Sequence, residues 1–179
     1  MILGAGPNQL PVIRKAVARG LFVITVDYLP HNIGHRYSSR SANCSTADQR
    51  GVLKAARELR NDGIMTFASD VAVPTVAYVG SKLNLPAGDH ECAVRMVNKA
   101  LFRQCQHEAH LNSSAFVVGR NLGELTKGGH LPISPLVVKP VDSSGSRGIS
   151  RVETRKGPML AKAVAAARQA SRSGTVCVE

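Results

Sequence analysis

The regular alternation of short apolar runs with helical patterns is the feature that most constrains the fold of this chain. Strands are predicted at residues 2–3, 21–27, 37–46 and 64–69. Helices are predicted to begin at Leu10, at Asp48 and at Ser69 or Asp70. Strands that alternate with helices pair in parallel through right-handed crossovers. The sequence therefore predicts a Rossmann-like, doubly wound α/β domain over residues 1–86.

The pattern changes after Pro86, where the helices become fewer and the strands follow one another more closely. Residues 89–111 predict a helix with apolar side chains available for a core: Val94, Val97, Leu101 and Leu111. A Gly- and Pro-rich loop with at most one helical turn is expected at 119–135. Strands are predicted at 115–119, at 136–141, at 148–153 and at 175–179, with a helix beginning at Pro158. Residues 87–179 therefore predict a smaller α+β unit.

One strand of this second unit ends in a lysine and runs straight into a donor-rich loop, in the stretch "LVVKPVDSSGSRGIS" (136–150). Glycines allow backbone N–H groups to turn inward, and several such donors form a concave anion site. Ser143, Ser144 and Ser146 add hydroxyl groups, and Lys139 or Arg147 supplies positive charge. No GxxxxGK[ST] motif is present, so this is not a Walker A loop. These residues alone favour a phosphate-binding loop and a plain surface hairpin about equally.

A family resemblance separates these two interpretations. "NKALFR" (98–103), "LVVKPVDSSGSRGIS" and "TVCVE" (175–179) resemble, in this order, the nucleotide-binding segments of the ATP-grasp superfamily of carboxylate–amine ligases. "ILGAGPNQ", "VD" (26–27) and "ASDVAVPTVAYVGSKLNLP" (68–86) are similar to the preceding domain of its carbamoyl-phosphate-synthetase-like and phosphoribosylaminoimidazole-carboxylase-like members. The resemblance implies a pre-ATP-grasp domain at 1–86 and the small lid subdomain, incomplete at the hinge, at 87–179.

The resemblance also implies roles for single residues. Lys99 would face the nucleotide phosphates from a helix start, and Lys139 would reach phosphate and the adenine side from its strand. The mobile loop over the β- and γ-phosphates would consist of Ser143, Ser144, Gly145, Ser146, Arg147 and Gly148. Glu179 would be the first residue of the hinge that reads the adenine edge.

Members of this superfamily continue beyond the hinge into a second subdomain that carries the acidic magnesium ligands and most of the acyl-phosphate chemistry. The twelve acidic residues of this chain form no such cluster in the sequence. We therefore expect ATP as the nucleotide and Mg²⁺ in the parent protein, with the magnesium ligands absent from this chain. We also expect the chain to be a fragment that binds ATP at most weakly and that catalyses nothing alone.

The glycine turn near the start supports an alternative. Gly4-x-Gly6-x-x-Gln9 after a strand, with Asp27 ending the next strand, is similar to a dinucleotide fingerprint in which Gln9 replaces the third glycine. An NAD(P)-binding oxidoreductase domain thus remains possible, and so does a purely structural turn. In an ATP-grasp ligase this edge would instead line the pocket for a small carboxylate substrate. Its candidate contacts are Gly6, Asn8, Gln9, Asp27 and Asp70.

The net charge of +11 raises nucleic acid as a partner. The basic residues are spread along the whole chain, however, and four Phe, three Tyr and no Trp provide little for base stacking. We therefore expect no nucleic acid, and leave a non-catalytic basic nucleotide-binding module as a further alternative. No apolar run approaches ~20 residues, so no membrane partner is expected. The oligomeric state is not predicted.

The cysteine and histidine patterns favour neither a disulfide framework nor a metal site. The four cysteines, at 44, 92, 105 and 177, form no CxxC pair or disulfide-like framework, which is typical of a protein of the reducing cytoplasm. His107 and His110 lie one helical turn apart near Cys105, a spacing that metal ligands use. Because polar residues surround them on the same helix, a solvated surface is favoured over a metal site.

Overall fold

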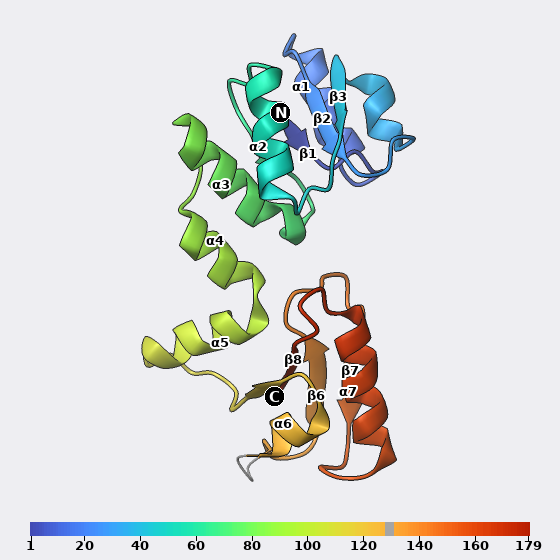
Figure 1. The fold of residues 1–179 in the computed structure, drawn as a ribbon, viewed down its shortest axis with the longest axis vertical. Coiled ribbons are helices and arrows are strands. Elements are labelled where there is room, and N and C mark those ends of the chain that lie inside the picture. Colours follow the sequence, from blue (N-terminus) through green and yellow to red (C-terminus); the bar gives the residue numbers. More distant parts are fainter. Residues whose placement is uncertain (128–130) are drawn as a thin grey trace. The chain divides into compact units, whose positions relative to one another are not determined.

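The computed structural model describes residues 1–127 and 131–179, and it divides into two compact units, Met1–Val94 and Arg95–Glu179 (Figure 1). Each unit has a sheet and a hydrophobic core of its own. The division falls eight residues after the predicted boundary at Pro86. The assignment of 1–86 to a pre-ATP-grasp domain and of 87–179 to the small lid subdomain of an ATP-grasp domain remains a prediction.

The first unit is built on a four-stranded parallel sheet in the order β3-β2-β1-β4. Its strands are β1 (Ile2–Leu3), β2 (Ile24–Asp27), β3 (Arg40–Asn43) and β4 (Met65–Thr66). Its helices are α1 (Leu10–Ala18), α2 (Gln49–Glu58), α3 (Val73–Leu83) and α4 (His90–Val97), with short 3₁₀ helices η1 (Ile33–Tyr37) and η2 (Asp70–Ala72). Helix α4 includes the point of division at Val94.

Period-two alternation in the strands buries both faces of this sheet. Ile2 packs with Ile13 of α1, whereas Leu3, the next residue, packs with Val52 of α2 and Val79 of α3. Helices therefore cover both faces, as the predicted doubly wound α/β fold requires.

The second unit is built on an antiparallel sheet in the order β5-β8-β6-β7. Its elements are α5 (Lys99–Glu108), β5 (Val117–Gly119), α6 (Leu122–Thr126), β6 (Leu136–Pro140), β7 (Ser150–Val152), α7 (Pro158–Ala170) and β8 (Val176–Val178). Strands β6 and β7 form the predicted hairpin around residues 141–149. The short α6 is the one helical turn expected in 119–135, a stretch in which 128–130 lie outside the described residues.

The core of this unit lies on one face of the sheet, under α7. Leu136 and Val138 of β6 and Val176 and Val178 of β8 are each 0% exposed, and they pack against apolar residues of α7. The buried residues of α7 are Leu160, Ala163, Val164 and Ala167. Because side chains alternate along a strand, the residues between them point to the other face.

The single helix predicted over 89–111 is wrong, because two helices meet at Asn98. The Asn98 backbone is extended (φ −101°, ψ 113°), and its side-chain oxygen accepts hydrogen bonds from the N–H groups of Ala100 and Leu101. Asparagine favours this capping role, so the chain ends α4 and starts α5 there. Leu111, expected in the core, lies beyond α5 and is 60% exposed.

No helix in the described part of the chain is long and apolar enough to cross a membrane.

Candidate functional site

Strands β6 and β8 carry a lysine and a glutamate to the sheet face opposite α7. Lys139 lies between the buried Val138 and Pro140, and Glu179 follows the buried Val178. The backbone of Glu179 pairs with Val137 through two hydrogen bonds of 2.6 and 3.0 Å, so β-type pairing with β6 extends to this residue. Both side chains are 12% exposed. The sheet thus places a cation and an anion beside each other on two fixed strands.

These two groups form a three-membered ion cluster with Arg103 of α5. Lys139 Nζ donates to Glu179 Oε1, and Arg103 Nε donates to Glu179 Oε2 at 2.7 Å. Burial by itself raises the pKa of Glu179, but the hydrogen bonds and positive charges of Arg103 and Lys139 together lower it below its ordinary value. Glu179 is therefore ionised near neutral pH, and the cluster keeps one surplus positive charge.

Lys99 begins α5 beside the serine- and glycine-containing loop. Its backbone N–H donates to Val141 O at 2.9 Å, and its side-chain Nζ donates to Ser143 O at 2.6 Å. A predicted phosphate-binding lysine and the predicted phosphate-binding loop are thus in direct contact, although 44 residues separate Lys99 from Ser143.

The base of the loop is anchored to the end of α7. Asp142 Oδ1 accepts from the hydroxyl group of Ser171 at 2.8 Å and from Arg172 N at 3.0 Å, and its Oδ2 accepts from Ser173 N at 2.8 Å. Burial raises the pKa of Asp142, but these hydrogen bonds outweigh burial and lower it. Ser143 Oγ donates to Ala170 O at 2.6 Å. The loop therefore starts from a fixed point on the helix.

The tip of the loop is exposed, and its backbone departs from ordinary conformations. Gly145, Ser146 and Gly148 have φ values of +67°, +57° and +71°. Gly145, Ser146 and Arg147 are exposed, whereas Ser144 and Gly148 are intermediate. Arg147 Nε donates back to Ser144 O at 3.3 Å. Left-handed residues of this kind turn backbone N–H groups toward a common side, which is the property that anion-binding loops use.

Arg103 is a site residue that the sequence interpretation missed. It lies four residues after Lys99, and residues at this spacing share one face of a helix. That spacing within "NKALFR" was the available signal. The partner of Arg103 was not visible in the sequence, because Glu179 is 76 residues away.

In the first unit, the predicted substrate residues all lie where strands end. Gly6 and Asn8 lie in the turn after β1, where Gly6 is half-buried and Asn8 is exposed. Asp27 ends β2, and Asp70 is exposed in η2 after β4. Ligands of open parallel sheets bind at this carboxyl edge. The structure therefore brings these candidates to one edge, while their role in binding remains a prediction.

Two of these candidates are buried and hold the edge together. Asp27 Oδ2 accepts from Ala5 N at 2.8 Å, and its Oδ1 accepts from Leu29 N at 3.0 Å. Gln9 is 8% exposed, and its Nε2 donates to Phe67 O at 2.6 Å. Asp27 thus fixes the turn after β1, and Gln9 ties that turn to the end of β4.

The side chain of Gln9 also occupies the space beside the glycine turn. A Cβ atom added to Gly4, where φ is +97°, would lie 3.0 Å from Gln9 Cδ, and one added to Gly6 would lie 3.3 Å from Gln9 Oε1. The third glycine of a dinucleotide fingerprint permits close packing of helix on strand. In this chain a glutamine side chain fills that position, which disfavours the dinucleotide alternative.

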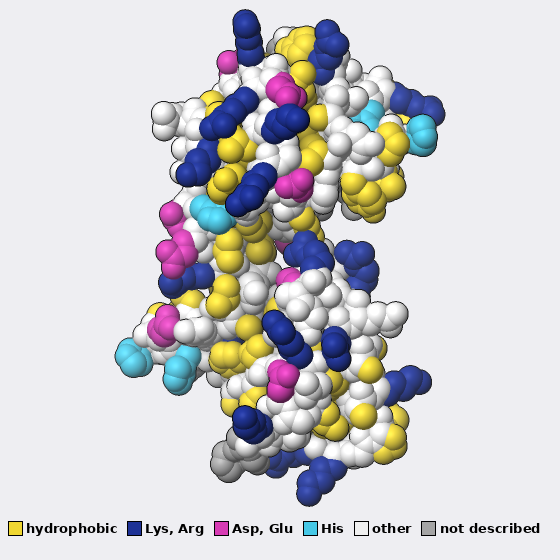
Figure 2. Space-filling view, in the orientation of Figure 1, with side chains coloured by type: hydrophobic (Ala, Val, Ile, Leu, Met, Phe, Trp, Pro, Cys, Tyr) yellow, Lys and Arg dark blue, Asp and Glu magenta, His cyan; other side chains and the backbone are white. Residues whose placement is uncertain are grey.

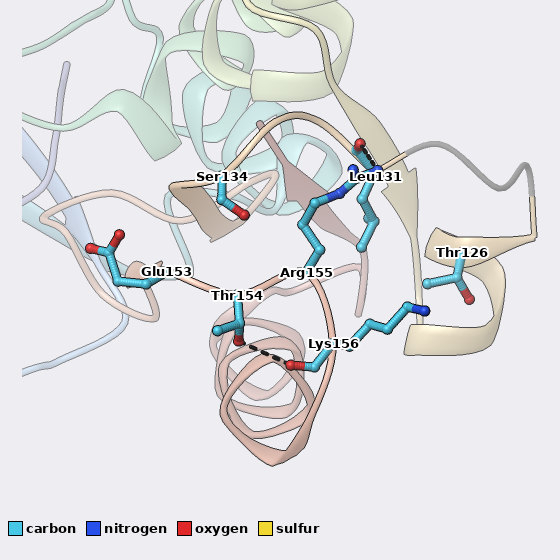
Figure 3. A pocket seen from close by; sticks show the side chains of 7 residues that line it. All are labelled: Thr126, Leu131, Ser134, Glu153, Thr154, Arg155 and Lys156. Atoms are coloured by element: carbon cyan, nitrogen blue, oxygen red, sulfur yellow. Dashed lines mark hydrogen bonds between the residues drawn. The ribbon is translucent and has the colours of Figure 1, made fainter.

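A cavity of about 950 Å³ lies elsewhere in the second unit, between the β7–α7 connection and the loop after residue 130 (Figure 3). It is lined by Thr126, Leu131, Ser134, Glu153, Thr154, Arg155 and Lys156. One of its two cationic side chains is engaged, since Arg155 donates to Leu131 O at 2.7 Å. None of the residues predicted to bind nucleotide lines it.

Residues 1–127 and 131–179 contain no group of three or more His, Cys, Asp or Glu side chains that could hold a metal ion. His107 and His110 are both exposed. At the predicted nucleotide site, Asp142 is engaged with residues 171–173, and Glu179 is engaged with Arg103 and Lys139. These carboxylates therefore do not fit a Mg²⁺ ion, which prefers several oxygen ligands free of competing cations.

Basic side chains are spread over the visible face of the molecule rather than gathered in one stripe (Figure 2). The second unit nevertheless holds thirteen of the 23 lysines and arginines and only five of the twelve acids. Its net charge is therefore +8, which favours an anionic ligand.

Comparisons with known proteins agree with the resemblance found in the motifs. No protein-family model matches the chain. The chain is 26% identical over 182 residues to the formate-dependent phosphoribosylglycinamide formyltransferase of Rhodococcus jostii. The matched region covers 100% of this chain and 45% of that protein. The fold matches L-amino acid ligase from Bacillus licheniformis with a TM-score of 0.71, at 25% identity over 99% of this chain and 42% of that one.

The fold also matches N5-carboxyaminoimidazole synthetase from Staphylococcus aureus complexed with ADP, with a TM-score of 0.73 at 13% identity, over 99% of this chain and 46% of that one. The chain thus spans less than half the length of these relatives. The relatives are ATP-grasp carboxylate–amine ligases, so the predicted resemblance and the predicted α/β fold class are confirmed.

Proposed function

We propose that this chain is the ATP-binding front part of an ATP-dependent carboxylate–amine ligase. The nucleotide phosphates would lie against Lys99, Lys139 and the loop 143–148, and Glu179 would begin the segment that reads the adenine edge. The chain alone is proposed to catalyse nothing, because the residues described here hold no carboxylates that fit a metal ion. A cytoplasmic location is part of the same proposal.

The observation that supports this proposal best is the convergence of the predicted nucleotide residues. Lys99 contacts Ser143 at the start of the loop, and Lys139 contacts Glu179 on the adjacent strand. With Arg103, these groups carry a surplus of two positive charges. Lys139 and Glu179 lie on the sheet face opposite α7, where Arg103 of α5 contacts Glu179, and Lys99 contacts a loop with left-handed glycines. Cations and inward-turning N–H groups together are the recurring elements of phosphate sites.

The reaction proposed for the parent protein has two steps. A carboxylate oxygen attacks the γ-phosphorus, the bond to the departing ADP oxygen breaks, and an acyl phosphate forms. An amine then attacks the acyl carbon, phosphate leaves with the bonding electron pair, and the amine loses a proton. In the first step, Lys99 and Lys139 would offset the charge that develops on the phosphate oxygens, and the loop 143–148 would exclude water. The ligands of Mg²⁺ are expected to be residues of the parent protein outside this chain.

The carboxylate substrate is proposed to bind at the carboxyl edge of the first unit, near Gly6, Asn8, Gln9, Asp27 and Asp70. The relatives are named for formate and for L-amino acids, so the resemblance leaves the carboxylate open. The amine is open as well.

The test is an isothermal calorimetric titration of the 179-residue chain with a non-hydrolysable ATP analogue in the presence of Mg²⁺. Lys139→Met and Lys99→Met should each weaken the affinity about tenfold or more, since each removes a charge-assisted hydrogen bond to phosphate. Lys162→Ala, which alters an exposed lysine of α7, is the matched control. Equal affinities for all four proteins would reject the site.

Three further measurements address the alternatives. Tighter binding of NADH than of the ATP analogue would favour the oxidoreductase alternative. Release of ADP by the chain alone, dependent on an added carboxylate, would contradict its proposed inactivity. If the full-length parent bound the ATP analogue but formed no ADP with any carboxylate, a non-catalytic basic nucleotide-binding module would be favoured instead.

A further inference from the structure

We propose that Arg103 is a positioning residue of the nucleotide site, which acts through Glu179 to keep the amine of Lys139 available to phosphate. This inference rests on the proposed function, because it assigns a role within the same site. Arg103 is not among the residues that the motifs assigned to nucleotide binding.

The two oxygens of the Glu179 carboxylate are divided between two cations. Lys139 occupies Oε1 and Arg103 occupies Oε2. Because each oxygen has its own partner, the carboxylate plane is held in one orientation. Lys139 therefore bonds to only one of the two carboxylate oxygens, and its amine retains N–H donors for another acceptor.

Arg103 is itself held from a second side. Its Nη1 donates to Gln106 Oε1 at 2.7 Å, one helical turn further along α5. The guanidinium group is planar and presents its donors in a fixed fork, so bonds at Nε and Nη1 together fix its plane. The side chain is 22% exposed, which protects these bonds from competition by water.

Removing Arg103 should change the position of the Glu179 side chain without releasing its main chain. The backbone of Glu179 stays paired with Val137, whereas Oε2 loses its donor. The carboxylate is then free to turn both oxygens toward Lys139, and the surplus positive charge of the cluster falls from one to zero. Both changes reduce the attraction of Lys139 for a phosphate group.

A lysine at position 103 should not restore this arrangement fully. A lysine amine is a single donor group on a flexible stem, and it does not reproduce the fork that bridges Glu179 and Gln106. The positive charge alone would return, so Arg103→Lys should lie between the original protein and Arg103→Gln.

The first arm of the test needs no nucleotide. The δ-carboxyl carbon of Glu179 is followed by NMR as pH is varied, in the original chain, in Arg103→Gln and in a control, Arg168→Gln, which alters an exposed arginine of α7. The pKa of Glu179 should rise in Arg103→Gln and stay unchanged in the control, because the hydrogen bond from Arg103 is the main interaction that lowers it. An unchanged pKa in Arg103→Gln overturns the inference.

The second arm is a double-mutant cycle read as affinity for a non-hydrolysable ATP analogue with Mg²⁺. Arg103→Gln should weaken binding about tenfold in the original chain and less than about twofold in a Glu179→Gln background, because the residue acts through Glu179. A merely structural role would give the same loss in both backgrounds, and that result overturns the inference. Circular dichroism of each variant identifies any that fail to fold, and Arg103→Lys then replaces Arg103→Gln in both arms.

The two arms separate this inference from the proposed function. Suppose that the chain binds no ATP analogue but Arg103→Gln still shifts the pKa of Glu179. This result would reject the proposed function and this inference together, although the coupling of Arg103 to Glu179 would stand as measured. A chain that binds the analogue with no shift in that pKa would reject the role of Arg103 alone.

Discussion

Replacement of Gly148 by alanine tests how firmly the loop 143–148, which is proposed to bind phosphate, packs on α7. An added Cβ atom at this position would lie 2.5 Å from Ala170 Cβ and 3.3 Å from Ala166 O. The first distance is far inside the ~3.5–4.0 Å optimum for two carbon atoms. The loop would therefore have to move away from α7, or the helix would have to move away from the sheet.

Gly145→Ala is the matched control for this substitution. Gly145 has φ +67° against +71° for Gly148, but no atom lies within 4 Å of its added Cβ. Both alanines carry the strain of a left-handed conformation, about 1–2 kcal/mol. Only Gly148→Ala adds overpacking, about 1–3 kcal/mol. The difference between the two variants therefore isolates the packing of the loop on α7.

The thiol of Cys177 provides a probe of unfolding in the second unit. It is 0% exposed, and burial raises its pKa to about 11. In the unfolded chain a cysteine has a pKa of about 8.5, and the thiolate is the form that reacts. A short pulse of a thiol reagent at about pH 8 therefore labels Cys177 in the unfolded state and not in the folded state. Mass spectrometry of the peptide that contains Cys177 then gives the unfolded fraction at each urea concentration.

At ~1.4 kcal/mol per factor of ten, the added overpacking corresponds to an unfolding constant ~5- to 150-fold larger for Gly148→Ala than for Gly145→Ala. Equal unfolding constants for the two variants would refute the packing of the loop on α7. A larger loss in Gly145→Ala would refute it as well.

Three further predictions concern the anchoring residues and the cysteines. Because hydrogen bonds lower the pKa of Asp142 in the folded chain, its contribution to stability should be full above about pH 4 and be lost as pH falls through the folded pKa. Asp142→Asn should therefore reduce the loss of stability at acid pH, followed by circular dichroism. An unaltered pH dependence would contradict the role of Asp142 in anchoring the loop. Asp27→Ala leaves the N–H groups of Ala5 and Leu29 without their acceptor and should destabilise the first unit by about 1–3 kcal/mol, measured as urea unfolding by tyrosine fluorescence; an unchanged midpoint would contradict the role of Asp27. In native buffer Cys92, which is exposed, should react with a thiol reagent well before Cys177, and the reverse order would contradict the burial described here.

Much of the fold could be predicted from the sequence because local signals agreed with one another. Asp48 caps α2 through its side chain, as expected from an aspartate before an amphipathic run. Pro74 lies in the first turn of α3, where proline is tolerated. The helix break at Asn98 was missed because the apolar pattern continues on both sides of it. The only local sign of the cap is a single polar residue within that pattern.

The candidate site was harder to predict because its contacts join distant parts of the chain. The order of motifs located Lys99, Lys139 and the loop 143–148, but nothing in the sequence paired Arg103 with Glu179. The anchoring role of Asp142 depends on residues 171–173, which follow α7, so its partners became visible only in the folded chain. At the glycine turn, the sequence left a dinucleotide site, a substrate pocket and a purely structural turn open, and the packing of the Gln9 side chain beside Gly4 and Gly6 disfavours the first of these.

The most direct test of the central claim is a residue-by-residue NMR titration of the 179-residue chain with a non-hydrolysable ATP analogue and Mg²⁺. The account predicts that the amide signals that shift most are those of Lys99, Lys139, residues 143–148 and Glu179, with smaller changes in the core under α7. Shifts concentrated in the glycine turn of residues 4–9, or an absence of shifts in residues 143–148 at saturating ligand, would contradict it.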